Sequence, residues 1–208
     1  MRTSDQEYFI SERAAYEKLV AMTWPNGPVC PRCACHDRIY DLGHIRADLK
    51  KCGGCRKQFT IRTCTIVAGS HMRLNRWLQA VYLTYASGGI ELVDILRIAL
   101  ELDQKAAQSF AHRTCGALGL ASTRSSENRA LRGQQKTVVK FAQRLQAISP
   151  STPKRRPHAR TQHEMFCLVA AELDRQISPA EFDAILARVV SFRRERSVTS
   201  AKRKTRKR

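Results

Sequence analysis

Two close pairs of cysteines constrain this chain more than any other feature of its sequence. Cys30 and Cys33 enclose Pro-Arg, and Cys52 and Cys55 enclose Gly-Gly, with eighteen residues between the pairs. One turn can present both sulfurs of such a pair, and four thiolates complete a tetrahedral shell around Zn²⁺. The spacing therefore predicts one structural zinc ion bound by these four residues, with the two glycines permitting a tight second knuckle.

Other uses of cysteine are weaker interpretations of the same pattern. A redox dithiol needs a single Cys-x-x-Cys, and a disulfide framework is typical of short secreted chains, whereas this chain has 208 residues. Cys35 and His36 lie close to the first pair but are not needed for a four-ligand shell. Cys64, Cys115 and Cys167 are expected to be small packing or surface residues.

The sequence around the cysteines predicts a small sheet preceded by a helix. Ser11 can cap a helix over residues 11–22, which the turn-rich stretch at residues 24–28 ends. Short β-type segments at residues 38–42, 45–49 and 58–62 predict an antiparallel ribbon.

Three helices are predicted after the ribbon. Apolar residues recur at helical spacing over residues 74–85, and Ser87, Gly88 and Gly89 follow as a stop signal. A second helix is expected over residues 90–100, and a third after the N-cap Asp103, with Ala107, Phe110, Ala111, Cys115 and Leu118 facing inward. The spacing is typical of a compact unit of three helices, within which the last two can form a helix-turn-helix.

The remainder is predicted to be basic and helical. We expect a basic amphipathic helix at residues 136–148, a linker at 149–160, helices at 162–175 and 179–194, and a disordered tail. The fold class is α+β, mostly α. The expected units are the N-terminal helix and turn (1–28), the zinc ribbon (29–72), the helix-turn-helix (73–120), the basic helix (121–148), the linker (149–160), the C-terminal helical pair (161–195) and the basic tail (196–208).

Charge points to a polyanionic partner. The net charge is +19, of which residues 121–208 contribute +14. The sequence shows no apolar run of signal-peptide or membrane-spanning length, so we expect a soluble cytoplasmic protein that does not enter membranes. Double-stranded DNA is the expected partner.

Two groups of residues are candidates for contacting that DNA. The exposed face of the third helix would carry Gln104, Lys105, Gln108, Ser109, His112 and Arg113, side chains able to reach base edges or phosphates. The ribbon contributes Lys50, Lys51, Arg56, Lys57 and Arg62. Either group could instead be an ordinary solvated surface, and the tail KRKTRKR could bind polyanions without sequence preference.

Residues 9–118 resemble the N-terminal region of bacterial insertion-sequence transposases that place a zinc ribbon and a helix-turn-helix before a DDE-type nuclease. The resemblance lies in WPNGPVCPRC, in KKCGGCRKQFTIRTCTIVAGSHMRLNRWLQAVYL and in GGIELVDILRIALELDQKAAQSFAHR, in matching order and spacing. It implies that Cys30, Cys33, Cys52 and Cys55 bind zinc, that residues 92–113 cover the DNA-binding helices, and that the protein is bacterial and nucleoid-associated.

The sequence departs from this family at two places. Cys64 stands where such sequences usually carry glycine before Thr65, and no acidic, glycine-rich strand follows residue 120. A two-metal nuclease needs carboxylates that converge from different strands, and the acids beyond residue 120 fall mostly on expected helices. The sequence therefore shows no complete catalytic set.

Three functions remain open at this point. The leading hypothesis is a zinc-dependent DNA-binding protein, either a truncated or diverged transposase or an element-associated regulator. The chain could instead be the DNA-recognition fragment of an active transposase whose catalytic part is on another chain. It could also be a protein-interaction module, with the C-terminal helices forming a homo-oligomer or binding a transposase partner. Binding insensitive to salt would favour this last alternative.

Overall fold

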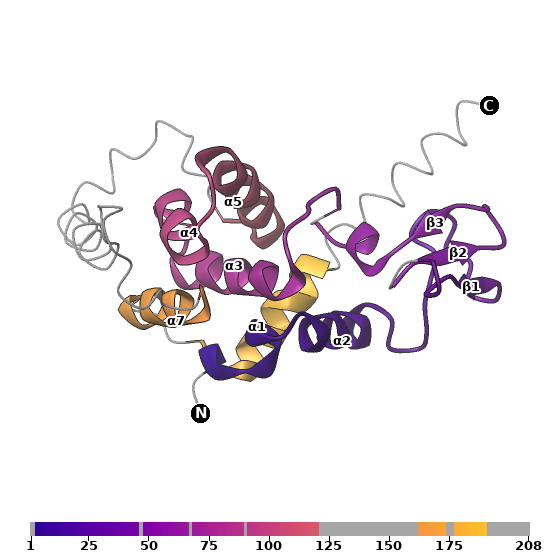
Figure 1. Cartoon of the computed structure of the whole chain (residues 1–208), viewed down its shortest axis with the longest axis horizontal. Helices are drawn as coiled ribbons and strands as arrows, with labels where there is room; N and C mark the ends of the chain where they lie inside the picture. Colours follow the sequence, from indigo (N-terminus) through magenta and orange to yellow (C-terminus); the bar gives the residue numbers. More distant parts are fainter. Residues whose placement is uncertain are drawn as a thin grey trace.

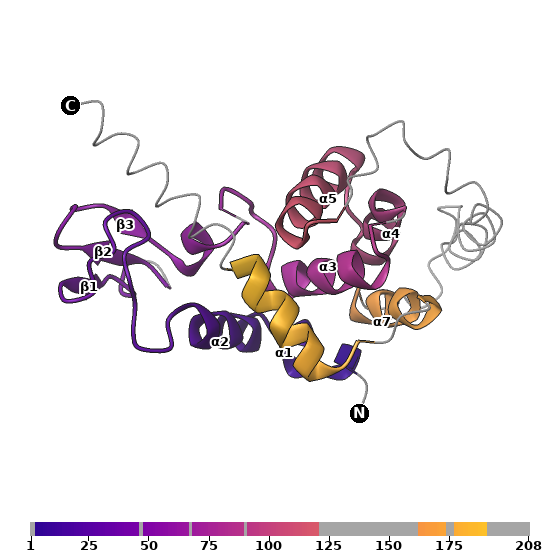
Figure 2. The same cartoon turned by 180° about the vertical axis from the view of Figure 1, so that it is seen from behind.

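Helices make up most of the described part of the chain, and a small sheet lies at one end of the long axis (Figures 1 and 2). The computed structural model describes residues 3–45, 48–66, 68–89, 91–120, 162–173 and 177–190. Its elements are η1 (Thr3–Asp5), α1 (Glu7–Ile10), α2 (Glu12–Thr23), β1 (Ile39–Asp41), β2 (Lys50–Cys52), β3 (Gln58–Phe59), η2 (Ile61–Cys64), α3 (Leu74–Ala86), α4 (Leu92–Leu100), α5 (Gln104–Leu118), α7 (Gln162–Glu172) and a further helix at 179–190. The predicted fold class, mostly helical with a small antiparallel ribbon, is confirmed.

The sheet is antiparallel with the strand order β1-β2-β3, but its middle strand is not where the sequence predicted it. We expected a strand at residues 45–49, whereas β2 begins at Lys50. The Asp41 carboxylate accepts a hydrogen bond from the Gly43 amide at 2.8 Å and starts a turn, so Ile45 lies in the connection with its side chain 64% exposed. The expected strand at 58–62 is likewise shortened to two residues, because the chain enters η2 after Thr60.

Capping residues place the helix boundaries close to those predicted. The Ser11 hydroxyl accepts from the Ala14 amide at the start of α2, and the Asp103 carboxylate accepts from the Ala106 amide at 2.8 Å at the start of α5. Helix α3 ends before Ser87, and Gly88 and Gly89 follow with positive φ. Helix α4 starts two residues later than expected, after Glu91 in the left-handed region.

The C-terminal helices share one hydrophobic core with the N-terminal ones. Phe166 on α7 and Phe182 on the helix at 179–190 lie against Phe9 of α1 and Tyr82 of α3, with ring centroids 5.1–6.0 Å apart. All four side chains are at most 2% exposed. The expected units 73–120 and 161–195 are therefore packed together. The helix expected at 136–148, the linker at 149–160 and the tail at 196–208 lie outside the described residues.

An aromatic contact and a salt bridge are among the interactions that join the ribbon to the helices. The rings of Trp24, after α2, and Phe59, on β3, meet edge to face with centroids 5.9 Å apart. The Arg62 guanidinium of η2 lies 2.9 Å from the Glu12 carboxylate and also donates to the Met72 carbonyl. The other Glu12 oxygen accepts from the Leu74 amide at 2.9 Å, so one side chain from α2 caps α3 and binds the ribbon's exit segment.

Candidate zinc centre and nucleic-acid interface

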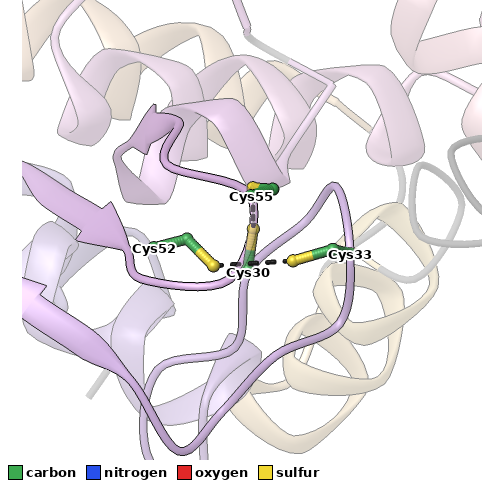
Figure 3. Close-up of side chains that lie close together, drawn as sticks. All are labelled: Cys30, Cys33, Cys52 and Cys55. Atoms are coloured by element: carbon green, nitrogen blue, oxygen red, sulfur yellow. Dashed lines mark hydrogen bonds between the residues drawn. The ribbon is translucent and has the colours of Figure 1, made fainter.

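The four predicted cysteine sulfurs converge on one point between the two knuckles (Figure 3). The Sγ atoms of Cys30 and Cys55 are 3.6 Å apart, those of Cys33 and Cys52 are 3.5 Å apart, and all four lie within 4.8 Å of one another. A tetrahedral zinc ion with Zn–S bonds of about 2.3 Å separates its sulfurs by about 3.8 Å. The cluster therefore fits one structural Zn²⁺ with small adjustments of the thiols.

Each knuckle turns through a residue in the left-handed region directly after its second cysteine. These residues are Ala34 and Arg56, both with φ of 59°. Gly53 serves a different purpose from the one predicted, since a Cβ atom there would lie 2.9 Å from Arg38 Cβ and 3.0 Å from Tyr40 Cε2. Glycine is needed at this position because another strand approaches closely, and the tight turn itself is made by Arg56.

The local environment shifts the pKa values of the buried thiols of Cys30 and Cys52 in opposite directions. Burial raises the pKa of Cys30 to about 12, because a thiolate away from water lacks solvation. Hydrogen bonds from the backbone amides of Cys55 and then Gly54 lower the pKa of Cys52. Four thiolates in this space repel one another, and a dication at their centre would supply the compensating charge. The seven cysteines whose side chains are described are free thiols, as zinc ligation requires.

Cys35 and His36 lie beside this centre but have other partners. The Cys35 carbonyl accepts a hydrogen bond from the Cys30 amide at 2.9 Å, which closes the first knuckle. The His36 Nε2 atom is 2.8 Å from the Asp37 carboxylate on the surface. Both residues therefore support or border the metal centre, while the four-sulfur cluster consists of the predicted ligands.

The five basic residues predicted on the ribbon divide into two groups. Lys50 is bound to Asp41 at 2.8 Å with its side chain only 13% exposed, and Arg62 is bound to Glu12. Lys51, Arg56 and Lys57 are exposed. Lys50 and Arg62 thus stabilise the ribbon and its junction with α2, which leaves the other three cations available to a polyanion.

The six residues predicted on α5 are all exposed and share one face of the helix. They form two adjacent rows at i, i+4 spacing, one with Gln104, Gln108 and His112 and the other with Lys105, Ser109 and Arg113. The opposite face is buried, including the predicted Ala107, Phe110 and Cys115. The Asp103 side chain caps the helix, and the residues of α5 itself include no acid.

Sequence reasoning missed the outer face of the ribbon sheet. Tyr40 on β1 pairs with Lys51 on β2, and Lys51 pairs with Gln58 on β3, so these side chains lie on one face. Tyr40 is 55% exposed. The alternation of side chains along the strands could have identified this face. It did not, because the middle strand was predicted at residues 45–49, five residues before β2 begins.

Fold and site together define a four-cysteine zinc ribbon packed beside a helical unit. Residues 10–58 match the family described as "Transposase zinc-ribbon domain". A relative from Halobacterium salinarum, described as an uncharacterized protein in the transposable element ISH50, is 33% identical over 75 residues, or 36% of this chain. The chain spans about a quarter of that relative's length. No solved structure matches.

These findings show a transposase-type zinc ribbon near the N-terminus of the chain and a similarity to a protein of a transposable element. The resemblance described from the sequence is thereby confirmed. Among the residues that the structure describes, no helix is both long and apolar enough to span a lipid bilayer.

Proposed function

We propose that this protein binds double-stranded DNA, with α4 and α5 acting as a helix-turn-helix and the zinc ribbon as a second contact on the phosphates. The observation that carries the proposal is the exposed face of α5, which gathers two glutamines, a lysine and an arginine. Gln can pair with adenine and Arg or Lys with guanine in the major groove.

The connection between α4 and α5 supports this role. Three residues, 101–103, separate the helices, and Glu101 is in the left-handed region with φ of 47°. A helix-turn-helix joins its two helices by a turn of this length and places the N-terminal part of the second helix against base edges. Gln104, Lys105 and Gln108 occupy that part of α5, and we assign them to base readout together with Arg113.

Buried contacts hold α5 firmly enough for such a role. The Thr114 hydroxyl on α5 lies 3.1 Å from that of Thr84 on α3, and both residues are fully buried. On the far side, the Arg188 guanidinium donates to the Leu118 carbonyl at the C-terminus of α5 at 3.1 Å. Both contacts lie in the C-terminal part of α5, and a recognition helix that is already held in place loses little conformational freedom on binding.

The ribbon would contribute affinity without sequence readout. Lys51, Arg56 and Lys57 are exposed and lie near one another in sequence and strand pairing. Contacts from such cations to phosphates release counterions, so each contact steepens the fall of affinity with salt by a slope of about 0.9. The zinc centre supports these contacts by ordering the ribbon.

The test is selection from random duplexes with the zinc-loaded full-length protein, followed by binding measurements on the enriched sequence. Gln108→Ala and Arg113→Ala should each weaken binding by about 1–3 kcal/mol and relax preference at one position. Arg13→Ala is the matched control, because Arg13 is an exposed arginine on α2 paired with Glu17. Equal weakening by Arg13→Ala and Arg113→Ala, or binding indifferent to salt, would refute the proposal.

A further inference from the structure

The outer face of the ribbon sheet combines an exposed aromatic ring with exposed cations. Tyr40, Lys51 and Gln58 lie side by side across β1, β2 and β3. Arg38, just before β1, lies beside them, because its Cβ and the Tyr40 ring border the same position at Gly53. The opposite face of the sheet carries Cys52 and Phe59, which are buried. One face of the sheet therefore holds a metal ligand and a core residue, and the other face holds the exposed ring and the cations.

Gly53 fixes the Tyr40 ring against the sheet. The Gly53 amide donates to the Arg38 carbonyl at 2.7 Å, and the space where a Cβ would lie is bordered by Arg38 Cβ and the Tyr40 ring at 2.9 and 3.0 Å. The edge of the ring is thus packed on backbone while the residue remains 55% exposed. A ring held in this way can receive a second flat group at a low entropic cost.

The charge around this face favours a polyanion. Residues 30–62 contain eight Lys or Arg and three Asp, and a zinc ion with four thiolates adds a net charge of −2, which leaves an excess of three positive charges. Asp41 is bound to Lys50, and Asp37 to His36. Arg38, Lys51, Arg56 and Lys57 are exposed and form no ion pair with any residue that the structure describes.

We propose that this face binds unpaired nucleotides of single-stranded DNA, with a base stacked on Tyr40 and the neighbouring phosphates held by Arg38 and Lys51. An exposed ring among cations is the combination that captures single strands, because every base has a π-face and stacking needs no sequence. Bases inside a duplex are already stacked on one another and present only their edges. The inference goes beyond the proposed reading of duplex DNA by α5 and does not depend on it.

The experiment measures binding of the zinc-loaded full-length protein to a labelled oligothymidylate of about ten nucleotides by fluorescence anisotropy. Tyr40→Ala should weaken binding by about 5- to 150-fold, whereas Tyr40→Phe should bind like the parent. Tyr40→Ala should leave the salt dependence unchanged. Lys51→Gln should reduce the slope of log affinity against log salt by about 0.7, as for loss of one phosphate contact on a single strand.

Ile45→Ala is the matched control, because Ile45 is an exposed apolar residue of the same ribbon. It should leave oligothymidylate binding unchanged. Gln108→Ala on α5 should also leave it unchanged, so failure of duplex recognition and failure of this proposal give different results. Equal binding by Tyr40→Ala and the parent, or a loss matched by Ile45→Ala, overturns the proposal. A loss that is as large for duplex as for single-stranded DNA also overturns it.

Tyr40→Trp provides an independent measurement if Tyr40→Ala lowers zinc content. The native tryptophans, Trp24 and Trp77, are 5% and 0% exposed, so an indole at position 40 would be the accessible one. Its emission should be quenched as oligothymidylate binds, with a midpoint equal to that from anisotropy. Unchanged emission at saturating oligothymidylate would show that no base stacks at this position.

Discussion

Replacing Phe166 by alanine tests whether the C-terminal helices belong to the same cooperative unit as α1 and α3. The Phe166 side chain is fully buried, with its ring 5.1 Å from that of Phe9 and 5.7 Å from that of Tyr82. Truncating a buried phenylalanine costs about 3–5 kcal/mol, because apolar contacts are lost and a cavity remains. A chain of this size has about 5–15 kcal/mol of stability, so the change should be large.

Urea unfolding can locate that loss in the N-terminal helices. In a Trp24→Phe background, the sole remaining tryptophan is Trp77 on α3, a helix remote in sequence from Phe166. With a denaturant slope of about 2 kcal/mol per molar urea, Phe166→Ala should lower the midpoint reported by Trp77 by about 1.5–2.5 M. The effect on Trp77 follows only if α7 and α3 unfold together.

Leu168→Ala is the matched control, because Leu168 lies on the same helix and is 36% exposed. Its truncation should cost about 1 kcal/mol or less, since water or neighbouring groups can fill the space. The reasoning is refuted if Phe166→Ala leaves the Trp77 transition where the parent has it, or shifts it no further than Leu168→Ala does. Either result would make the C-terminal helices a separate folding unit.

Three further predictions follow from single contacts. Cys52→Ser should abolish stoichiometric zinc binding and remove amide-exchange protection over residues 30–59, because three thiolates leave the shell open; a zinc content equal to that of the parent would contradict this. Glu12→Gln should lower the free energy of unfolding by about 1–2 kcal/mol, because it weakens the charge-assisted hydrogen bonds from Leu74 and Arg62. The control Glu17→Gln removes the charge from an exposed pair with Arg13 and should cost under about 0.5 kcal/mol. Equal losses of stability in the two variants would count against the bridging role of Glu12. Burial lowers the pKa of His163, so its imidazole binds a proton more readily in the unfolded chain than in the folded one. The stability that this burial allows above about pH 6.5 should therefore fall as the pH drops towards about 5. The urea midpoint of His163→Gln should depend less on pH in this window than that of the parent, and an equal pH dependence would refute the role of His163.

Local patterns in the sequence were enough to predict the metal centre and most of the helices. The four ligands follow from cysteine spacing, because the geometry of a zinc knuckle is encoded within four residues. The starts of α2 and α5 follow from Ser11 and Asp103, whose side chains satisfy free amides at helix N-termini. The same reasoning predicted the exposed face of α5, since its buried residues recur at helical spacing.

Interactions between distant segments could not be predicted in this way. Lys50 and Arg62 look like free cations in the sequence, but their partners are an aspartate across a hairpin and Glu12, fifty residues earlier. The sequence predicts a helix at residues 162–175 but not that its Phe166 meets Phe9. Ile45 favoured a strand by its side chain, and the turn started by Asp41 overrode that preference.

The junction between ribbon and helices determines how the two proposed DNA-binding surfaces can act together. If residues 24–28 and 65–73 were flexible tethers, the ribbon would reach phosphates only at an effective concentration set by linker length. Instead, Trp24 packs on Phe59, and Arg62 binds both Glu12 and the chain just before α3. These contacts hold the ribbon against α2 and the start of α3, so under the proposed function a strand bound by the ribbon would lie at a set position relative to a groove read by α5. Breaking the junction with Glu12→Gln should therefore weaken binding to a DNA that carries both a duplex and a single-stranded end more than binding to either part alone.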